Sequence, residues 1–217
     1  MSTLSERARQ GSKRRELQRL ETVRAIEAAA LRLFREHGYE ATTTKQIAEA
    51  AGVAHGTVFL VAPSKEGLLV VVLEAQLREV ATARMATLPK RGIAAQLTYL
   101  CAPLFDYFAA NPALSRALLK GMMFFADPVA KARRDAHVGD FLRYLASLFA
   151  EAKQRGELAY RADPQICAAN VFAIYIDAVT AFLTADKPDR RALGASFETR
   201  LDALLRGVVD RSHEKRR

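Results

Sequence analysis

Apolar residues recur along most of the chain at steps of three and four, and strand-like alternation of apolar and polar residues is rare. The first such stripe lies between residues 17 and 37 and consists of Val23, Ile26, Ala30, Leu33 and His37. It predicts an amphipathic helix that ends at Gly38, because glycine adopts the left-handed conformation of a helix stop without strain. The fold class predicted from this pattern is all-α.

Two short helices are expected next. Thr43 can cap a short helix that Gly52 ends. A tight Gly-Val-Ala turn leads into a second short helix from Ala54 to about Val61. This arrangement predicts a helix-turn-helix unit, in which the second helix enters the major groove of DNA. An ordinary helical hairpin gives the same pattern and remains the alternative.

Capping residues and prolines divide the remainder of the chain. Ser64 can cap a long helix that runs to about Thr87. Asn111, Asp127 and Asp163 each stand before a proline, which is typical of a helix start because proline fits the first helical position. The later helices are predicted at 92–110, 112–124, 128–156, 164–185 and 188–209.

Several small motifs follow one another between Ile26 and Leu69. They are Phe34 before Gly38–Tyr39, a Thr-Thr pair before Ile47–Ala48, Ala51–Gly52–Val53, Gly56–Thr57 and Ser64–Lys65–Glu66. In their order and spacing the chain resembles the TetR family of bacterial transcriptional regulators, whereas residues 90–217 match only in helical layout. The resemblance implies a helix-turn-helix DNA-binding domain of three helices at 17–65. It also implies a C-terminal helical ligand-binding and dimerisation domain at 66–217.

The resemblance further implies which residues touch DNA. Residues at the start of the first short helix match positions that contact phosphates and the groove edge. Residues at the start of the second helix match positions that enter the groove, and Lys65 matches a lysine that clamps a phosphate at a helix N-terminus. The implied DNA-binding residues are Thr43, Thr44, Lys45, His55, Gly56, Thr57, Phe59, Leu60 and Lys65.

The chain departs from the family pattern in its second short helix. Phe59 stands where a tyrosine is usual, so a hydroxyl that would reach a phosphate is lost, and Ala54 cannot cap the helix as a serine or threonine would. Val61 and Ala62 stand where a histidine and a phenylalanine are usual, and with Val58 they are expected to pack onto the three-helix core. Phe59 and Leu60 are expected to touch thymine methyls or sugar carbons of DNA, with packing in the core as the alternative.

The charge of the chain indicates a polyanionic partner. It carries 33 Lys and Arg against 24 Asp and Glu, which gives a net charge of +9 and a pI of about 9.8. Basic residues gather in residues 1–16, which are predicted to form a disordered arm. We expect Arg7 to Arg15 to contact DNA phosphates or the minor groove and so to offset the missing hydroxyl. A solvated tail without this role is the alternative.

The predicted second domain is rich in aromatic and methionine side chains. The resemblance implies a ligand cavity among its central helices, and such a composition suits a small apolar or aromatic effector. Ordinary core packing explains the same residues. The candidate pocket residues are Tyr99, Phe105, Phe108, Met122, Phe125, Phe141, Tyr144, Phe172 and Tyr175.

The predicted helix at 164–185 has two apolar faces, although a surface helix needs only one. The resemblance implies that this helix and the last one pair with their copies in a homodimer. Burial within one subunit is the alternative. The candidate interface residues are Ile176, Val179, Leu183, Phe197, Leu201 and Leu204.

Other classes of protein find little support. The chain has no Gly-x-Ser-x-Gly, His-Glu-x-x-His or glycine-rich phosphate loop, so no enzyme, cofactor or metal site is predicted. Cys101 and Cys167 have no metal-ligand spacing and are expected to be buried thiols. The polar N-terminus and the lack of a long uncharged apolar run predict a cytoplasmic protein without a membrane partner. The predicted function is a ligand-responsive, homodimeric transcriptional regulator, most simply a repressor of a palindromic DNA operator. The alternative is a polyanion binder that does not read sequence.

Overall fold

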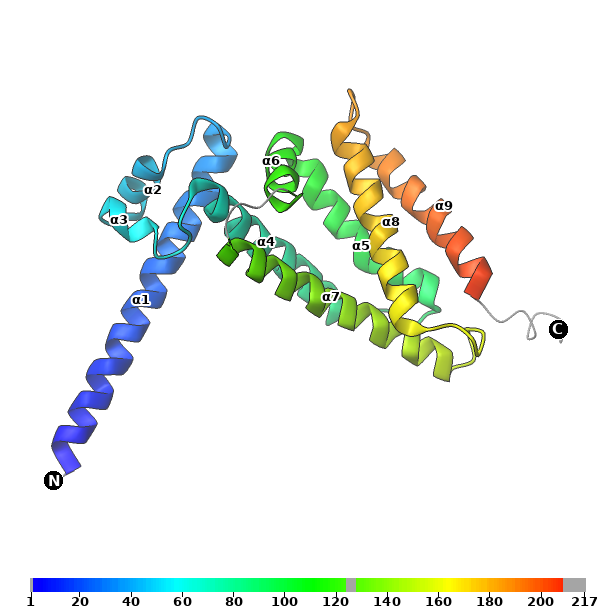
Figure 1. Ribbon diagram of the computed structural model, residues 1–217, viewed down its shortest axis with the longest axis horizontal. Coiled ribbons are helices and arrows are strands. Elements are labelled where there is room, and N and C mark those ends of the chain that lie inside the picture. The colour runs from blue at the N-terminus through cyan, green and yellow to red at the C-terminus, as the bar shows by residue number, and fades with distance from the viewer. Residues whose placement is uncertain (1, 124–127, 209–217) are drawn as a thin grey trace. The chain divides into compact units, whose positions relative to one another are not determined.

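The computed structural model describes residues 2–123 and 128–208, and in these ranges the chain forms nine α-helices and no β-strand (Figure 1). The all-α prediction is therefore confirmed. The helices are α1 (Ser2–His37), α2 (Thr44–Ala51), α3 (His55–Val58), α4 (Lys65–Met85), α5 (Ile93–Ala110), α6 (Pro112–Met123), α7 (Pro128–Gln154), α8 (Pro164–Thr184) and α9 (Arg190–Val208).

The chain divides into two compact units. The first contains Met1–Leu73 and Lys120–Lys131, and the second contains Glu74–Leu119 and Ala132–Arg217. The helices α4, α6 and α7 each contribute residues to both units. The predicted boundary after residue 65 falls near the end of the first stretch, and the assignment of a separate function to each part stays a prediction.

Local capping signals place the ends of the short helices. The Thr43 hydroxyl accepts the backbone N–H of Gln46, and the Gln46 side chain accepts the backbone N–H of Thr43, so the two form a capping box. Gly52 ends α2 in the left-handed conformation at φ 67°, and Gly38 follows α1 at φ 80°. Ala54 provides no side-chain cap for α3, as its methyl group predicts.

The core of the first unit forms where α1, α2 and the start of α4 meet. Ile26, Phe34 and Ile47 are fully buried there, together with Leu68 and Leu69 of α4. His37 was predicted to extend the buried stripe of α1, but it is exposed because the helix stops at its position and its last turn leaves the core.

The N-terminal segment differs from the prediction. Residues 2–16, expected to form a disordered arm, belong to α1, whose first half projects beyond α2 and α3 (Figure 1). The segment lacks proline and contains four arginines, two glutamates and a lysine, which have high helix propensity, so it can continue a helix that is already nucleated. From Arg9 to Leu20 every residue is exposed, so these residues are not held in the helix by packing within the chain.

In the second unit α8 packs against α5 and α9. By length and composition α8 could cross a membrane, with a mean hydropathy of 1.9, although Asp177 interrupts its apolar run. The absence of a membrane span therefore stays a prediction. The core helix of a folded domain passes the same test, and Val171 and Ala178 of α8 are buried inside the unit. Cys101 of α5 and Cys167 of α8 are buried free thiols, as predicted.

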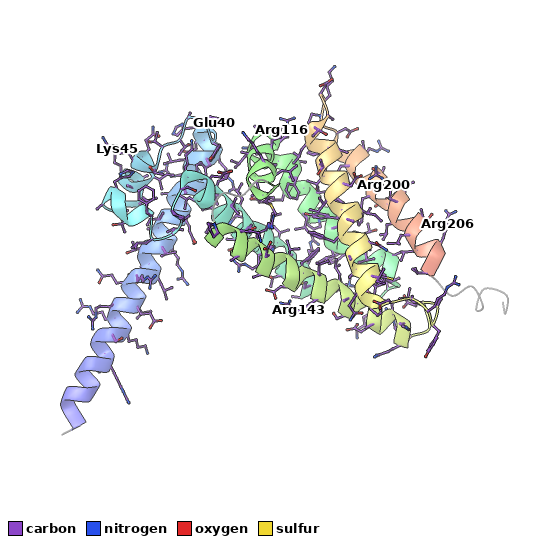
Figure 2. The ribbon with its side chains drawn as sticks, viewed as in Figure 1. Glu40, Lys45, Arg116, Arg143, Arg200 and Arg206 are labelled. Atoms are coloured by element: carbon purple, nitrogen blue, oxygen red, sulfur yellow. The ribbon has the colours of Figure 1, made fainter. Side chains whose placement is uncertain are left out.

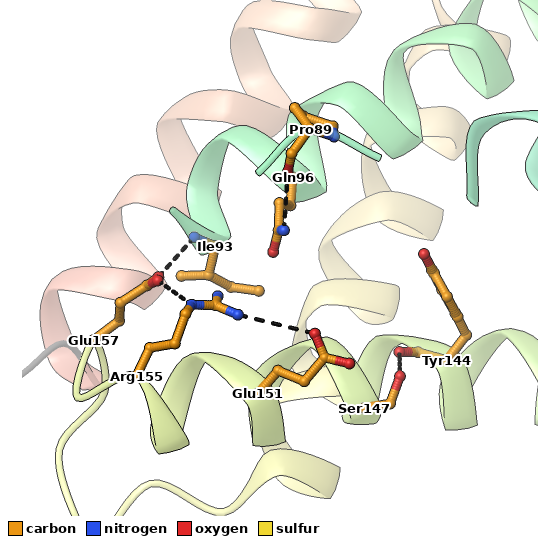
Figure 3. Close-up of polar contacts among 8 residues, drawn as sticks. All are labelled: Pro89, Ile93, Gln96, Tyr144, Ser147, Glu151, Arg155 and Glu157. Atoms are coloured by element: carbon orange, nitrogen blue, oxygen red, sulfur yellow. Dashed lines mark hydrogen bonds and ion pairs between the residues drawn. The ribbon is translucent and has the colours of Figure 1, made fainter. Parts of the chain in front are cut away.

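A carboxylate links the loop after α7 to the start of α5. Glu157 accepts the backbone N–H of Ile93 at 2.9 Å and the Arg155 Nε–H at 2.6 Å (Figure 3). Partial burial raises the pKa of Glu157, but the bonds from Arg155 and Ile93 outweigh burial and leave the pKa below its ordinary value. Gly92, which precedes α5, has no side chain to cap the helix, and Glu157 supplies the acceptor from a distant part of the chain.

Candidate nucleic-acid interface

The two short helices are joined at their N-terminal ends by a polar contact. The Thr44 hydroxyl lies 2.9 Å from Nε2 of His55, so the first residue of α2 is tied to the first residue of α3. Because Gly52 and the turn after it reverse the chain, these two helix starts come to the same side of the unit. This is the arrangement that a helix-turn-helix unit needs to present both helix starts to one ligand.

Most of the predicted DNA-contacting residues share this open side. Lys45, His55 and Gly56 are exposed, and Thr44 and Thr57 are half-buried, and we call these five residues the recognition face. The Lys45 side chain extends outward from α2 (Figure 2). Thr43 is exposed as well, but its hydroxyl already serves as the cap of α2.

The apolar residues in and after the second short helix lie in two different environments. Val58, Val61 and Ala62 are at most 3% exposed and belong to the core, as predicted. Phe59 and Leu60 are 42% and 57% exposed, so the alternative that they pack in the core is excluded. The α-helical part is shorter than predicted and ends at Val58, after which backbone bonds from Leu60 to Thr57 and from Val61 to Val58 form tight turns.

Lys65 stands at the start of α4, as the sequence predicts, but its ammonium contacts backbone carbonyls. Its ammonium donates to the carbonyl oxygens of Tyr39 at 2.9 Å, Glu40 at 3.3 Å and Thr42 at 3.1 Å, and it lies 4.3 Å from the centre of the Tyr39 ring. An ammonium has only three N–H donors, so none is left for a phosphate in this arrangement. Lys65 therefore holds the loop between α1 and α2.

Sequence reasoning missed the residues that complete this loop. The single O–H of the buried Thr42 hydroxyl is shared between the carbonyl oxygens of Gly38 at 2.8 Å and Leu33 at 3.2 Å. The run of three threonines was the available signal, since only one of them is needed as the cap. Thr42 and Lys65 together satisfy carbonyl groups that would otherwise be unpaired where α1 ends.

Most of the net positive charge of the first unit lies in the first half of α1. Residues 17–73 contain six Lys or Arg and six Asp or Glu, whereas residues 1–16 contain five and two. The helix-turn-helix body is therefore electrically balanced, and one of its cations, Lys65, is committed to backbone carbonyls. Attraction to a polyanion must come mainly from the exposed basic side chains of α1, Arg9, Lys13, Arg14 and Arg15.

The structure gathers five of the predicted pocket residues into one aromatic cluster in the second unit. Tyr175 lies at its centre, with its ring centre 5.5 Å from that of Phe105 and 6.1 Å from that of Phe172. Phe108 and Phe141 each lie 6.4 Å from Tyr175. Burial raises the pKa of the Tyr175 hydroxyl well above its ordinary value, so the phenol stays protonated and can donate a hydrogen bond.

The other predicted pocket residues that the structure describes are Tyr99, Tyr144 and Met122. The Tyr99 hydroxyl is 2.9 Å from that of Thr87, and the Arg84 guanidinium stacks on the Tyr99 ring. Tyr144 is half-buried, and Met122 belongs to the first unit. Phe125 lies outside the described residues.

An open pocket of about 540 Å³ lies between α7 and α8, and none of the predicted residues lines it. Its lining is mostly small and apolar, with Arg143 and Gln165 at its edges. The aromatic side chains that were predicted to line a cavity pack against one another instead, because their ring edges and faces fill the space between α5, α7 and α8.

The prediction for the homodimer surface needs a correction. Four of the six predicted residues are at most 2% exposed in the single chain: Val179, Leu183, Phe197 and Leu201. They fill the contact between α8, α9 and α5 inside the second unit and present no surface to a second copy. Ile176 and Leu204 are only half-buried and stay candidates. Nearby, Arg200 of α9 forms an ion pair with Asp177 of α8 at the surface (Figure 2).

Comparisons with known proteins agree with this geometry. A family model described as "Bacterial regulatory proteins, tetR family" matches residues 26–72. The HTH-type transcriptional repressor KstR of Mycolicibacterium smegmatis is 31% identical to the chain over 183 residues, which cover 83% of each protein. The TetR-family repressor FadR of Thermus thermophilus, solved in complex with lauroyl-CoA, superposes with a TM-score of 0.69 at 24% identity over 88% of this chain and 96% of FadR. TylP, a TetR regulator of Streptomyces fradiae, gives a TM-score of 0.62 at 24% identity over 91% of this chain and 90% of TylP.

Proposed function

Because the chain belongs to the tetR family of bacterial regulatory proteins, we propose that it is a homodimeric repressor that binds a palindromic DNA operator and releases it when an apolar effector binds. The observation that carries the proposal is the recognition face, on which the starts of α2 and α3 are tied together by Thr44 and His55 and open to solvent. Apart from Gly56 the side chains of this face are polar, which suits a polar partner such as a DNA groove.

The distribution of charge supports a division of labour in DNA binding. The balanced helix-turn-helix body reads the groove, and the basic half of α1 supplies attraction to phosphates. Because this half is helical, it is about 10–12 Å across and cannot thread a minor groove about 6 Å wide. We therefore favour phosphate contacts for Arg9, Lys13, Arg14 and Arg15 over the minor-groove contact that a disordered arm would make.

The effector and the dimer contact are proposed for the second unit. The FadR structure of Thermus thermophilus contains lauroyl-CoA, a ligand with a long apolar chain. An apolar effector that parts the rings around Tyr175 would find an apolar surface and one phenolic donor. The helix α4 contributes residues to both units, so a change in its position is a means of coupling the effector to DNA. Ile176 and Leu204 are proposed at the dimer contact.

The experiment that tests the proposal is selection of bound fragments from genomic DNA by the purified full chain, followed by a salt titration on the selected fragment. We expect the selection to yield one palindromic sequence, which the chain binds with an affinity roughly 10³-fold or more above that for random DNA. Equal binding to all fragments, with a steep loss of affinity in salt, would identify a polyanion binder that does not read sequence.

A further inference from the structure

Two exposed apolar side chains adjoin the recognition face. Phe59 and Leu60 are both more than 40% exposed, although Val58 and Val61 on either side of them are buried. An exposed phenylalanine beside an exposed leucine does not contribute to the core of the unit. A partner that offers both polar and apolar contacts would match this surface.

Phe59 and Leu60 come directly after α3, which ends at Val58. Phe59 keeps right-handed helical dihedral angles, at φ −72° and ψ −3°, and Leu60 donates its N–H to the Thr57 carbonyl. The chain therefore continues in a tight turn, and the two apolar side chains adjoin the short helix that carries His55, Gly56 and Thr57.

The ring of Phe59 is held in place by the recognition face itself. Its centre lies 5.4 Å from that of the His55 ring, at an angle of 67° between the planes. His55 is in turn bound to Thr44. A ligand that contacts His55 thus meets Phe59 without any rearrangement of the unit.

Neither side chain can form a hydrogen bond, so their partner must be an apolar group. In the major groove the 5-methyl group of thymine is the apolar feature that distinguishes one base pair from the others. We propose that Phe59 and Leu60 are specificity-determining residues that pack against thymine methyl groups, and that each operator half-site carries thymine where they dock. This inference rests on the proposed DNA-binding function and names the chemistry that the site reads.

The test uses the operator selected above, with deoxyuridine placed at each thymine in turn. Deoxyuridine keeps base pairing and the O4 acceptor and removes only the methyl group. At one or two positions per half-site we expect the affinity of the full chain to fall roughly 3- to 5-fold, the factor for one buried methyl. The variants Phe59→Ala and Leu60→Ala should bind the thymine operator more weakly and lose the uracil penalty.

Two further variants act as controls. Ile166 of α8 is 61% exposed, so Ile166→Ala removes a comparable apolar surface far along the chain and should leave both affinity and the uracil penalty unchanged. Phe59→Tyr adds a hydroxyl that can reach a phosphate; it should raise affinity for every sequence alike and keep the uracil penalty.

The outcomes separate this inference from the proposed function. If one sequence is preferred but uracil costs nothing at any thymine, or if the penalty persists in both alanine variants, the methyl contact is wrong and operator binding stands. If the selection yields no preferred sequence, the proposed function fails and the inference fails with it.

Discussion

Gly56 offers a direct test of whether the backbone of α3 approaches DNA. A Cβ added at Gly56 would meet no atom within 4 Å, and the residue does not adopt the left-handed conformation. The protein alone therefore tolerates alanine there. Since alanine is favoured over glycine in a helix, Gly56→Ala should stabilise the fold by about 0.5–1 kcal/mol. For a chain of this length, that corresponds to a rise in melting temperature of about 1–4 °C.

The same methyl group should weaken DNA binding. If the helix backbone lies against the groove at Gly56, the added Cβ displaces it and loosens the neighbouring base contacts. Loss of one good base contact costs about 1–3 kcal/mol, so affinity for the selected operator should fall roughly 5- to 150-fold. Melting curves and fluorescence anisotropy with a labelled operator measure the two effects separately.

Gly207 provides the matched control, because a Cβ there also meets nothing within 4 Å and the residue lies in α9 of the second unit. Gly207→Ala should leave operator affinity unchanged. The reasoning is refuted if Gly56→Ala melts higher than the parent chain and yet binds the operator within two-fold of it. A lower melting temperature for Gly56→Ala would instead show that the space around Gly56 has been misjudged.

Three other perturbations have expected outcomes. Lys65→Met should lower stability by about 1–3 kcal/mol in a melting experiment, because three carbonyls lose their donor; an unchanged melting temperature with a salt slope smaller by about one per subunit would restore its predicted phosphate role. Replacing Arg9, Lys13, Arg14 and Arg15 by glutamine should reduce the slope of log affinity against log salt by up to about 3–4 per subunit, or about 7 for the proposed dimer, while the preferred sequence stays the same; an unchanged slope would leave these side chains without a DNA contact. Glu157→Gln should destabilise the chain by about 0.5–1.5 kcal/mol at pH 7. The pKa of Glu157 is lower in the folded state than in the unfolded state, so the stability that its charge contributes is present above the unfolded pKa and is lost as pH falls through the folded pKa. The melting temperatures of variant and parent should therefore converge in acid. A difference in melting temperature that persists at low pH would mean that the charge of Glu157 is not the cause.

Local signals in the sequence were enough to predict most of the fold. Thr43 with Gln46, the left-handed Gly52 and the prolines that begin α6 and α8 act within one or two turns of the chain, so their effect can be read without knowing the tertiary structure. The burial of Val58 could be predicted for the same reason, since the period of a helix identifies its inner face.

Contacts between distant residues could not be predicted in this way. The carbonyl groups that hold Lys65 lie 23 to 26 residues before it, and no local pattern shows that the loop after α1 turns its oxygens toward the start of α4. The same limit applies to α8. Its two apolar faces are compatible with a dimer interface, and only the tertiary structure shows that α8 packs against α5 and α9 and that Val179 and Leu183 are buried. The helical form of residues 2–16 was missed because charge was taken as a sign of disorder, although the same residues have high helix propensity.

In the first unit the basic side chains and the proposed groove-reading side chains lie on different segments of the chain, which affects how specificity for one DNA sequence arises. A balanced helix-turn-helix body gains little from phosphates, so its affinity for any DNA is low unless the basic half of α1 also binds. That basic contribution is the same for every sequence. Discrimination must then come from the few groups at the groove, the polar pair Thr44 and His55 and the apolar pair Phe59 and Leu60. Loss of the α1 cations should therefore lower affinity for operator and random DNA by the same factor, whereas loss of Leu60 should narrow the ratio between them.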